Sequence, residues 1–368
     1  MKYYLIAGEA SGDLHGANLM KEILLIDPHA EFRFWGGDAM QEVSENIVTH
    51  YKDVAFMGFL EVIKHLPLIL GKIKACKKDI EAFNPDRLIL IDYPGFNMRI
   101  AKWAKPKGYE VTFYISPTIW AWKKKRGWQL KKTVDKMIVI LPFEKEVYKK
   151  YDMDVHYVGH PLLDAIEQFE PDPSFKKKYN IETGKVLAIL PGSRVQEVEK
   201  ILPIMGAAID QMKEEVHLLL ACTKHVPRSV YEEALKNVKN RNIQYIIADT
   251  YNILNIADAA LVSSGTATLE TALFKVPQVV CYKTSTISYQ IASRLVDLEY
   301  MSLVNLIMNR PVVAEFLQDD FTLDNLMPAL ADIMGDKRRQ ILDDYEELVA
   351  MLGNSGASGR VAEIVVGA

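Results

Sequence analysis

The chain has 368 residues, of which 49% are hydrophobic and 25% are charged, as in ordinary soluble globular proteins. This length exceeds that of a single ordinary core, so we expect two domains. The formal net charge of −4 argues against a general nucleic-acid-binding protein, and we predict no nucleic-acid partner.

Three cysteines, Cys76, Cys222 and Cys281, lie far apart in the sequence and form no C-x-x-C pair. Their spacing predicts neither a disulfide framework nor a zinc site, and it favours a reducing cytoplasm. The apolar run that ends at Ala7 is too short for an export signal, so we expect no leader.

Strands and helices are predicted to alternate along the first half of the chain. A helix is expected at residues 13–25, with Asp13 as its cap. Apolar runs predict strands at residues 2–7, 32–35, 87–91, 111–115 and 137–141. The order strand, helix, strand is typical of a doubly wound parallel sheet.

The segment 54–71 is rich in apolar residues but includes charged residues and Pro67, so we do not expect it to cross a membrane. Its apolar residues at helical spacing include Phe59, Val62, Ile63 and Leu66. Two interpretations stay open: this face packs against the sheet, or it also touches a membrane surface.

Aromatic and basic residues are interleaved between Trp120 and Lys132. Four basic residues are consecutive, namely Lys123, Lys124, Lys125 and Arg126. Such a stretch suits RNA or an anionic lipid surface, and a solvated charged helix is the alternative. The negative net charge favours the lipid surface over RNA.

A cluster of turn-forming and charged residues at 167–184 marks the expected boundary between domains 1–168 and 169–368. The strand pattern then restarts at residues 186–190, 217–221, 244–248, 259–262 and 278–282. We therefore predict an α/β fold of two Rossmann-like halves facing across a cleft, with ligands at the carboxyl ends of the strands. Helices are expected beyond about residue 324, free to pack back on the first domain.

The turn after the first predicted strand reads G-E-A-S-G-D at residues 8–13. Its glycines let the backbone approach a ligand, and Glu9, Ser11 and Gly12 are candidate substrate contacts. The spacing is not G-x-G-x-x-G and no G-K-[ST] follows, so a dinucleotide enzyme or P-loop NTPase is disfavoured. Asp92, which ends a predicted central strand, is a candidate general base, with capping of the next helix as the alternative.

A second ligand turn is predicted at Ser264, Gly265 and Thr266, between a strand and a helix. Unpaired backbone N–H groups at such a turn attract anions such as phosphate, although an ordinary helix cap is the alternative. Glu270 lies one helical turn past Thr266, where its carboxylate suits the hydroxyls of a ribose.

Ser193 and Arg194 follow the strand predicted at 186–190 and offer a hydroxyl and a guanidinium suited to phosphate oxygens. We predict no metal site, because the D-x-D triplet at 152–154 is attributed to chance and His156 and His160 flank a predicted strand. No cofactor is predicted.

Six short motifs occur in the order seen in the lipid-A-disaccharide synthase family, and the resemblance covers nearly the whole chain, thinning after about residue 310. They are G-E-A-S-G-D at 8–13, S-P-T-I-W-A-W at 116–122, L-P-F-E at 141–144, G-H at 159–160, L-P-G-S-R at 190–194 with Glu197, and S-G-T-A at 264–267 with Glu270.

The resemblance implies a two-domain GT-B glycosyltransferase of Gram-negative bacteria. Such an enzyme joins UDP-2,3-diacylglucosamine to 2,3-diacylglucosamine 1-phosphate (lipid X), with inversion, and yields UDP and a β-1,6-linked disaccharide. The family implies no metal, and its acylated substrates imply a cytoplasmic protein held peripherally on the anionic inner membrane. A homodimer is left open.

The resemblance also bears on residue roles. Asp92 matches the first aspartate of the family's motif and ranks ahead of His15 as the base for the acceptor's 6-hydroxyl. Asn305, in S-L-V-N at 302–305, is a further expected substrate contact. Two positions depart from the family pattern: Gly95 stands where a second aspartate is frequent, and Val304 where proline is common.

Two other functions stay open. One is another UDP-sugar enzyme of the same fold, such as the peptidoglycan N-acetylglucosaminyltransferase or a UDP-N-acetylglucosamine 2-epimerase. The other, from a different class, is a non-catalytic module that binds a membrane surface.

Overall fold

The computed structural model describes residues 1–53, 66–121, 124–285, 289 and 299–367. The chain divides into two compact units, which we call unit 1 (Met1–Ala165 with Asn354–Ala368) and unit 2 (Ile166–Gly353). The boundary expected from the sequence followed residue 168, and the C-terminal helices were assigned to the second domain but expected to be free to pack back on the first. In the structure, Asn354–Ala368 belongs to unit 1.

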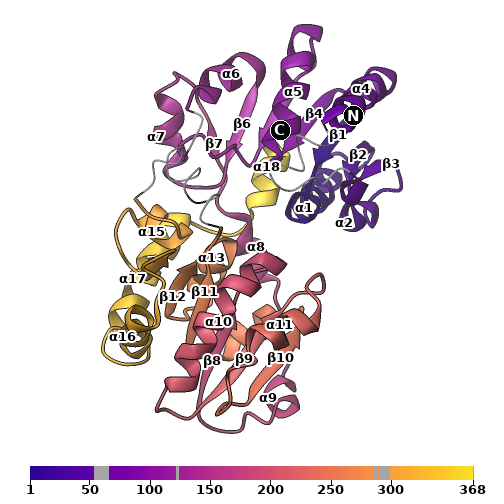
Figure 1. Cartoon of the computed structure of the whole chain (residues 1–368). Helices are drawn as coiled ribbons and strands as arrows, with labels where there is room; N and C mark the ends of the chain where they lie inside the picture. Colours follow the sequence, from indigo (N-terminus) through magenta and orange to yellow (C-terminus); the bar gives the residue numbers. More distant parts are fainter. Residues whose placement is uncertain (54–65, 122–123, 286–288, 290–298, 368) are drawn as a thin grey trace. The chain divides into compact units, whose positions relative to one another are not determined.

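Unit 1 is built on a parallel sheet with helices on both faces (Figure 1). Its elements are β1 (Lys2–Ala7), α1 (Ala10–Ile26), β2 (Glu31–Gly36), α2 (Asp38–Gln41), β3 (Ile47–His50), η1 (Tyr51–Asp53), α4 (Leu66–Phe83), β4 (Arg87–Ile91), α5 (Pro94–Ala104), η2 (Lys105–Lys107), β5 (Val111–Tyr114), α6 (Arg126–Thr133), β6 (Lys136–Val139), α7 (Glu144–Lys149), β7 (His156–Tyr157), α8 (Pro161–Glu167) and α18 (Ala357–Val366).

The strand order of this sheet is β3-β2-β1-β4-β5-β6-β7, and every pairing is parallel. Strand addition reverses direction between β1 and β4, which makes their carboxyl ends a topological switch point where ligands bind in this fold. Alternate residues of β1 serve two cores. Tyr4 and Ile6 pack with α4 and α5, while Tyr3 and Leu5 pack with α1 and α18.

Unit 2 has a second parallel sheet with the order β10-β9-β8-β11-β12-β13. Its elements are α9 (Phe175–Lys178), β8 (Lys185–Leu190), α10 (Val195–Gln211), β9 (Val216–Cys222), α11 (Arg228–Ala234), β10 (Ile243–Ile247), α12 (Thr250–Ile256), β11 (Ala259–Ser263), α13 (Thr266–Leu273), β12 (Gln278–Tyr282), α15 (Leu303–Met308), β13 (Ala314–Leu317), α16 (Leu323–Met334) and α17 (Arg338–Leu352).

The switch point of the second sheet lies between β8 and β11, in the position that β1 and β4 occupy in the first. One core of unit 2 joins β8 and β11 to α9 and α12. Two doubly wound parallel sheets confirm the predicted α/β class with two Rossmann-like halves.

Every predicted strand is present, and its ends agree within one or two residues. Two strands were missed, namely β3 and β13. Each is an edge strand, and its residues are largely half-buried or exposed. Edge strands keep polar residues because they are covered on fewer sides, so they lack the continuous apolar pattern of a central strand.

The expected cap of the first helix is wrong. The helix α1 begins at Ala10, so Asp13 lies within its first turn and is buried. Its carboxylate instead accepts the backbone N–H groups of Gly37 at 2.6 Å, Ala39 at 3.0 Å and Met40 at 3.2 Å. Asp13 therefore caps α2, a helix that begins 25 residues further along the chain.

The N-terminal end of α18 is capped by an acidic side chain from α8. The buried carboxylate of Asp164 accepts the N–H groups of Gly356 at 2.6 Å and of Ala357 and Ser358 at 3.1 Å each. A negative charge is favourable at the positive end of the helix dipole.

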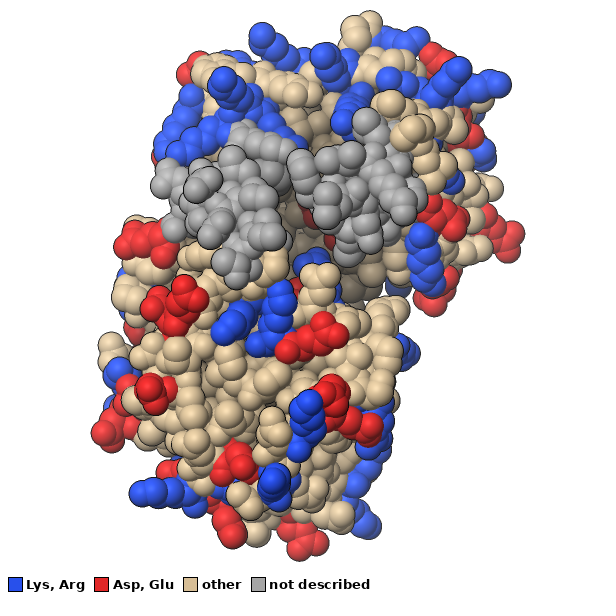
Figure 2. All heavy atoms as spheres, viewed as in Figure 1, with Lys and Arg blue, Asp and Glu red and all other residues tan. Residues whose placement is uncertain are grey.

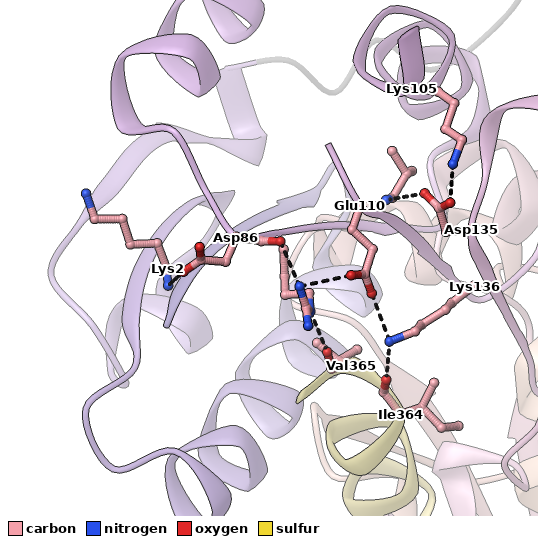
Figure 3. Close-up of polar contacts among 10 residues, drawn as sticks. Lys2, Asp86, Lys105, Glu110, Asp135, Lys136, Ile364 and Val365 are labelled. Atoms are coloured by element: carbon pink, nitrogen blue, oxygen red, sulfur yellow. Dashed lines mark hydrogen bonds and ion pairs between the residues drawn. The ribbon is translucent and has the colours of Figure 1, made fainter. Parts of the chain in front are cut away.

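The C-terminal end of α18 meets basic side chains from the sheet (Figure 3). Arg87 Nε donates to the carbonyl of Val365 at 3.0 Å, and Lys136 Nζ donates to that of Ile364 at 2.8 Å. Glu110 pairs with both cations, at 2.9 and 2.8 Å. Both helix ends are thus bound by groups whose charge opposes the helix dipole, which fastens α18 to unit 1.

Some predicted membrane contacts lie outside the described residues, namely Phe59, Val62, Ile63 and Lys123. Leu66 is the first residue of α4. Among the helices that the structure describes, none is both long enough and apolar enough to span a bilayer.

Candidate active site

A pocket of about 390 Å³ lies at the carboxyl ends of β8, β9 and β11 in unit 2. It sits at the switch point of the sheet, where a doubly wound fold binds its ligands. Six residues predicted from the sequence line it together: Ser193, Arg194, Ser264, Gly265, Thr266 and Glu270.

The turn between β8 and α10 is held by an acidic side chain. Glu197 accepts the backbone N–H groups of Ser193 at 2.9 Å and Arg194 at 3.2 Å, and its other oxygen lies 3.3 Å from the Arg194 guanidinium. Gly192 has a φ of +110°, and a Cβ there would come within 2.4 Å of the Glu197 carboxylate. The Arg194 side chain is 65% exposed, so its remaining N–H groups can reach a ligand.

The turn between β11 and α13 is fixed by its backbone. Ser264 donates its N–H to the carbonyl of Cys281 at 3.1 Å and its hydroxyl to that of Met301 at 3.2 Å. Gly265 has a φ of +150°, which side chains rarely adopt. The helix then begins at Thr266, so the N–H groups of its first turn form a positive end facing the pocket.

The carboxylate of Glu270 lies on the second turn of α13 and lines the same pocket. Burial raises the pKa of Glu270 above its usual range, and a hydrogen bond from Tyr251 partly opposes that shift. The Tyr251 hydroxyl donates to Glu270 Oε1 at 3.1 Å. The pocket therefore combines anion-binding groups at its turns with the Glu270 carboxylate as a hydrogen-bond acceptor.

Asn305 does not line this pocket, and its amide is engaged within unit 2. It donates to the carbonyl of Val313 at 2.9 Å and to Glu315 at 2.7 Å, and its oxygen accepts the N–H groups of Val312 and Val313 at 2.8 and 3.0 Å. These contacts give Asn305 a structural role, and its contact with substrate stays a prediction.

Val304 is the second residue of α15, in the first helical turn. Ser302 caps this helix, since its hydroxyl oxygen accepts the N–H of Asn305 at 3.2 Å. Proline is tolerated in a first turn because its missing N–H would have no partner inside the helix. Valine in place of the family's proline is therefore compatible with the same helix start.

In unit 1, Asp92 follows β4 at the switch point of the first sheet. Burial and, to a smaller extent, the charge of Glu9 raise the pKa of Asp92 to about 6. Asp92 and Tyr93 have φ values of 45° and 48°, so the backbone of two consecutive non-glycine residues is left-handed. Such strain is retained where a side chain must be presented in one direction.

Asn97 ties together the two strand ends at this switch point. Its buried amide donates to the carbonyls of Ile6 at 3.3 Å, Ile91 at 3.2 Å and Asp92 at 2.8 Å. This amide joins the end of β1 to the end of β4 and fixes the backbone that carries the Asp92 carboxylate.

His15 lies on α1, with its ring edge-on to Tyr114 at a centroid distance of 6.3 Å. Burial lowers the pKa of His15 to about 4. Burial and then the neighbouring His15 lower the pKa of His160 to about 3. Both imidazoles are thus neutral near pH 7, and Asp92 is more basic than His15.

The other predicted residues of unit 1 are placed as follows. Glu9 and Ser11 are exposed at the start of α1. Gly12 is buried, and a Cβ there would lie 3.3 Å from the Cβ of Ala7, so glycine lets α1 pack closely on β1. Lys124 and Lys125 are exposed just before α6, and Arg126 begins that helix.

Sequence reasoning missed three residues that shape these sites: Asn97, Tyr251 and Glu315. Glu197 was named only as part of the family motif, and an acid three residues after a helix cap is also a capping signature. Tyr251 contacts Glu270 from another helix and Glu315 contacts Asn305 from β13, and no local signal marks either contact.

The family model described as lipid-A-disaccharide synthetase matches residues 3–365. A lipid-A-disaccharide synthase of Syntrophus aciditrophicus (strain SB) is 36% identical over 364 residues, which cover 97% of this chain and 95% of the relative. A lipid-A-disaccharide synthase of Geobacter sulfurreducens is 33% identical over 371 residues, covering 98% and 96%.

Solved structures agree on the fold. A UDP-GlcNAc 2-epimerase from Neisseria meningitidis, bound to UDP-GlcNAc, has a TM-score of 0.65 and 13% identity, with full coverage of both chains (100% each). The glycotransferase of kitacinnamycin has a TM-score of 0.67 and 14% identity, covering 99% of this chain and 98% of that one. These likenesses place the two sheets in the GT-B fold. The match to the family model over nearly the whole chain, together with the curated relatives, shows that this protein belongs to the lipid-A-disaccharide synthetase family.

Proposed function

We propose that this protein transfers a 2,3-diacylglucosaminyl group from its UDP carrier to the 6-hydroxyl of lipid X, giving the β-1,6-linked disaccharide 1-phosphate and UDP. The main support for the proposal is the unit 2 pocket, where two N–H-rich turns, the Arg194 guanidinium and the Glu270 carboxylate converge in a member of this family. That set of groups is complementary to a nucleoside diphosphate.

In this proposal unit 2 binds the donor. The diphosphate is bound by Arg194 and by the turn from Ser264 to Thr266, which offer charge-assisted and helix-terminal hydrogen bonds. Glu270 accepts hydrogen bonds from the ribose. Ser193 adds a hydroxyl to the same wall.

Unit 1 binds the acceptor, with Glu9, Ser11 and Gly12 in the contacting turn. Asp92 takes the proton from the 6-hydroxyl as this oxygen attacks the anomeric carbon, and the anomeric configuration inverts. A pKa of about 6 leaves Asp92 ionised at neutral pH yet basic enough to accept a proton.

The test is UDP release measured with and without lipid X. We expect UDP to appear only when UDP-2,3-diacylglucosamine and lipid X are both present, in an amount equal to the lipid X consumed. UDP release that is indifferent to lipid X would contradict acceptor transfer, and a protein that binds membranes without releasing UDP would be a binding module.

A UDP-sugar epimerase is the second candidate, since the Neisseria meningitidis structure shares this fold and was bound to UDP-GlcNAc. Incubation with UDP-GlcNAc alone and analysis of the sugar by NMR separates the two. We expect the gluco configuration to persist, whereas appearance of the manno epimer would favour the epimerase.

Arg194→Ala is expected to weaken UDP binding about tenfold or more, because a hydrogen bond to a charged group contributes about 1.5–3 kcal/mol. Calorimetric titration with UDP measures the effect. Arg228→Ala is the matched control, since Arg228 is an exposed arginine of unit 2 that pairs with Glu232 and does not line the pocket. Equal UDP affinity in the two variants would remove Arg194 from the diphosphate site.

We further propose that unit 1 docks on the anionic inner membrane from the cytoplasmic side. The helices α4, α5 and α6 cover the same face of the first sheet. Two leucines of α4, Leu68 and Leu70, are 48% and 53% exposed, and Trp128 of α6 is 49% exposed. Figure 2 shows Lys and Arg side chains gathered over α5 and α6. Apolar side chains beside basic ones suit a lipid surface.

Reversing the charge of Lys125, Lys131 and Lys132 to Glu is expected to release the protein from anionic vesicles, because each basic residue near such a surface contributes about 1 kcal/mol. Sedimentation with phosphatidylglycerol vesicles measures binding. The control reverses three exposed lysines of unit 2, Lys213, Lys236 and Lys239. If the unit 1 variant still sediments with the vesicles, or if both variants are released equally, the docking surface lies elsewhere.

A further inference from the structure

The Glu270 carboxylate accepts a hydrogen bond from the hydroxyl of Tyr251. Tyr251, on the neighbouring helix α12, donates to Glu270 Oε1 at 3.1 Å. A carboxylate accepts hydrogen bonds on both oxygens, so this contact leaves the acceptor capacity of Oε2 for a ligand. The bond also restricts rotation about the terminal torsion of the glutamate, which is otherwise soft.

The Tyr251 ring is itself fixed by aromatic packing. It lies 5.5 Å from the ring of Phe169 in an edge-on arrangement and 5.1 Å from that of Phe274, and these two phenylalanines are 5.6 Å apart. Three mutually contacting rings hold the hydroxyl in place independently of any ligand. Tyr251 is therefore an anchor rather than an adaptable contact.

Glu270 and Thr250 line two hollows of unit 2. The first is the pocket described above, and the second, about 450 Å³, is lined by Ala248, Asp249, Thr250, Tyr251 and Glu270. Tyr251 lines the second hollow, whereas the turns at Ser193 and Ser264 line the first. Tyr251 thus contacts the carboxylate but does not line the pocket of the two turns.

We infer that Tyr251 is a positioning residue whose hydroxyl aims the Glu270 carboxylate at the ribose hydroxyls, and so sets the preference for a ribonucleotide over a deoxyribonucleotide. The inference rests on the proposed function, because it takes the ligand of the pocket to be a nucleoside diphosphate. Tyr251 acts through Glu270 and leaves the phosphate contacts unchanged.

The test uses Tyr251→Phe, which removes the hydroxyl and keeps the three-ring cluster. Calorimetry on the full chain compares UDP with 2′-deoxy-UDP and 3′-deoxy-UDP. The wild type should bind at least one deoxy analogue more weakly than UDP. In Tyr251→Phe, UDP affinity should fall about three- to tenfold while affinity for that analogue stays within about twofold, so the preference collapses. Tyr245→Phe removes a hydroxyl from a ring that lies beside Arg228 and is the matched control. This variant should keep the preference for UDP over the deoxy analogue.

The outcomes separate this inference from the proposed function. Unchanged ribose preference in Tyr251→Phe, or equal weakening of all three nucleotides, would overturn the positioning role, because a merely structural tyrosine would affect them alike. A wild type that binds none of the nucleotides would instead overturn the proposed donor site. In a Glu270→Ala background, Tyr251→Phe should leave the preference unchanged, since its effect passes through the carboxylate.

Discussion

Replacing Asp92 with Asn is expected to lower kcat by about 10²- to 10⁴-fold while UDP still binds, which is the usual contribution of a general base. The amide keeps the shape of the side chain but cannot take the proton of the acceptor hydroxyl. Steady-state turnover and UDP calorimetry on the same preparation measure both quantities. Near-normal turnover in Asp92→Asn, with His15→Ala inactive, would transfer the role to the histidine.

The pH dependence provides an independent check on the same residue. A base must be deprotonated, and the raised pKa of Asp92, about 6, means that kcat/KM, which reports the free enzyme, should fall as the pH drops through about 6. Removing the charge of Glu9 with Glu9→Gln should lower that pKa and move the acidic limb to lower pH. If His15 were the base, the fall in rate at acidic pH would lie near the pKa of His15, about 4.

A stability measurement shows whether Asp92→Asn stays folded. Because folding raises the pKa of Asp92 from 3.8 to about 6, the ionised carboxylate opposes folding above pH 6, and this effect disappears below about pH 4. The variant should therefore melt no lower than the wild type at pH 8. Loss of activity accompanied by a lower melting temperature would indicate misfolding instead of a missing base.

Asp164→Ala is expected to reduce the stability of unit 1 by about 2–4 kcal/mol, since it removes the acceptor of three N–H groups at the start of α18. For a unit of this size the melting temperature should fall by about 5–15 °C in differential scanning calorimetry. The melting temperature of Asp164→Asn, which keeps one acceptor oxygen, should lie between those of the wild type and Asp164→Ala.

The matched control is Asp154→Ala, at an exposed aspartate of the same unit. It should leave the melting temperature within about 2 °C of the wild type, as surface substitutions usually do. If Asp164→Ala and Asp154→Ala melt alike, then the carboxylate does not hold α18, and the apolar residues Val361, Ala362 and Val365 alone fasten it.

The strands of both sheets were predictable because central parallel strands are buried on both faces and read as continuous apolar runs. Residues 87–91 are the clearest case. Ser193 and Ser264 were predictable for a related reason: each lies in the turn after such a strand, so both had to lie at the same edge of one sheet.

Contacts between distant parts of the sequence were not predictable. Asp164 caps a helix that begins 193 residues later, and Tyr251 reaches Glu270 from a different helix. Asp13 shows the limit even at short range. An aspartate is a typical helix cap, so a capping role was predicted. Which helix Asp13 caps depends on how α1 and α2 pack, and the local sequence does not show this.

The mass of the product formed from UDP-2,3-diacylglucosamine and lipid X decides whether this protein forms the disaccharide. We predict one new species with the mass of the two diacylglucosamine units joined with loss of UDP and retention of one phosphate, formed by the wild type and strongly reduced in Asp92→Asn. Consumption of the UDP-sugar without this disaccharide, or formation of a UDP-sugar of unchanged mass but altered configuration, would contradict it.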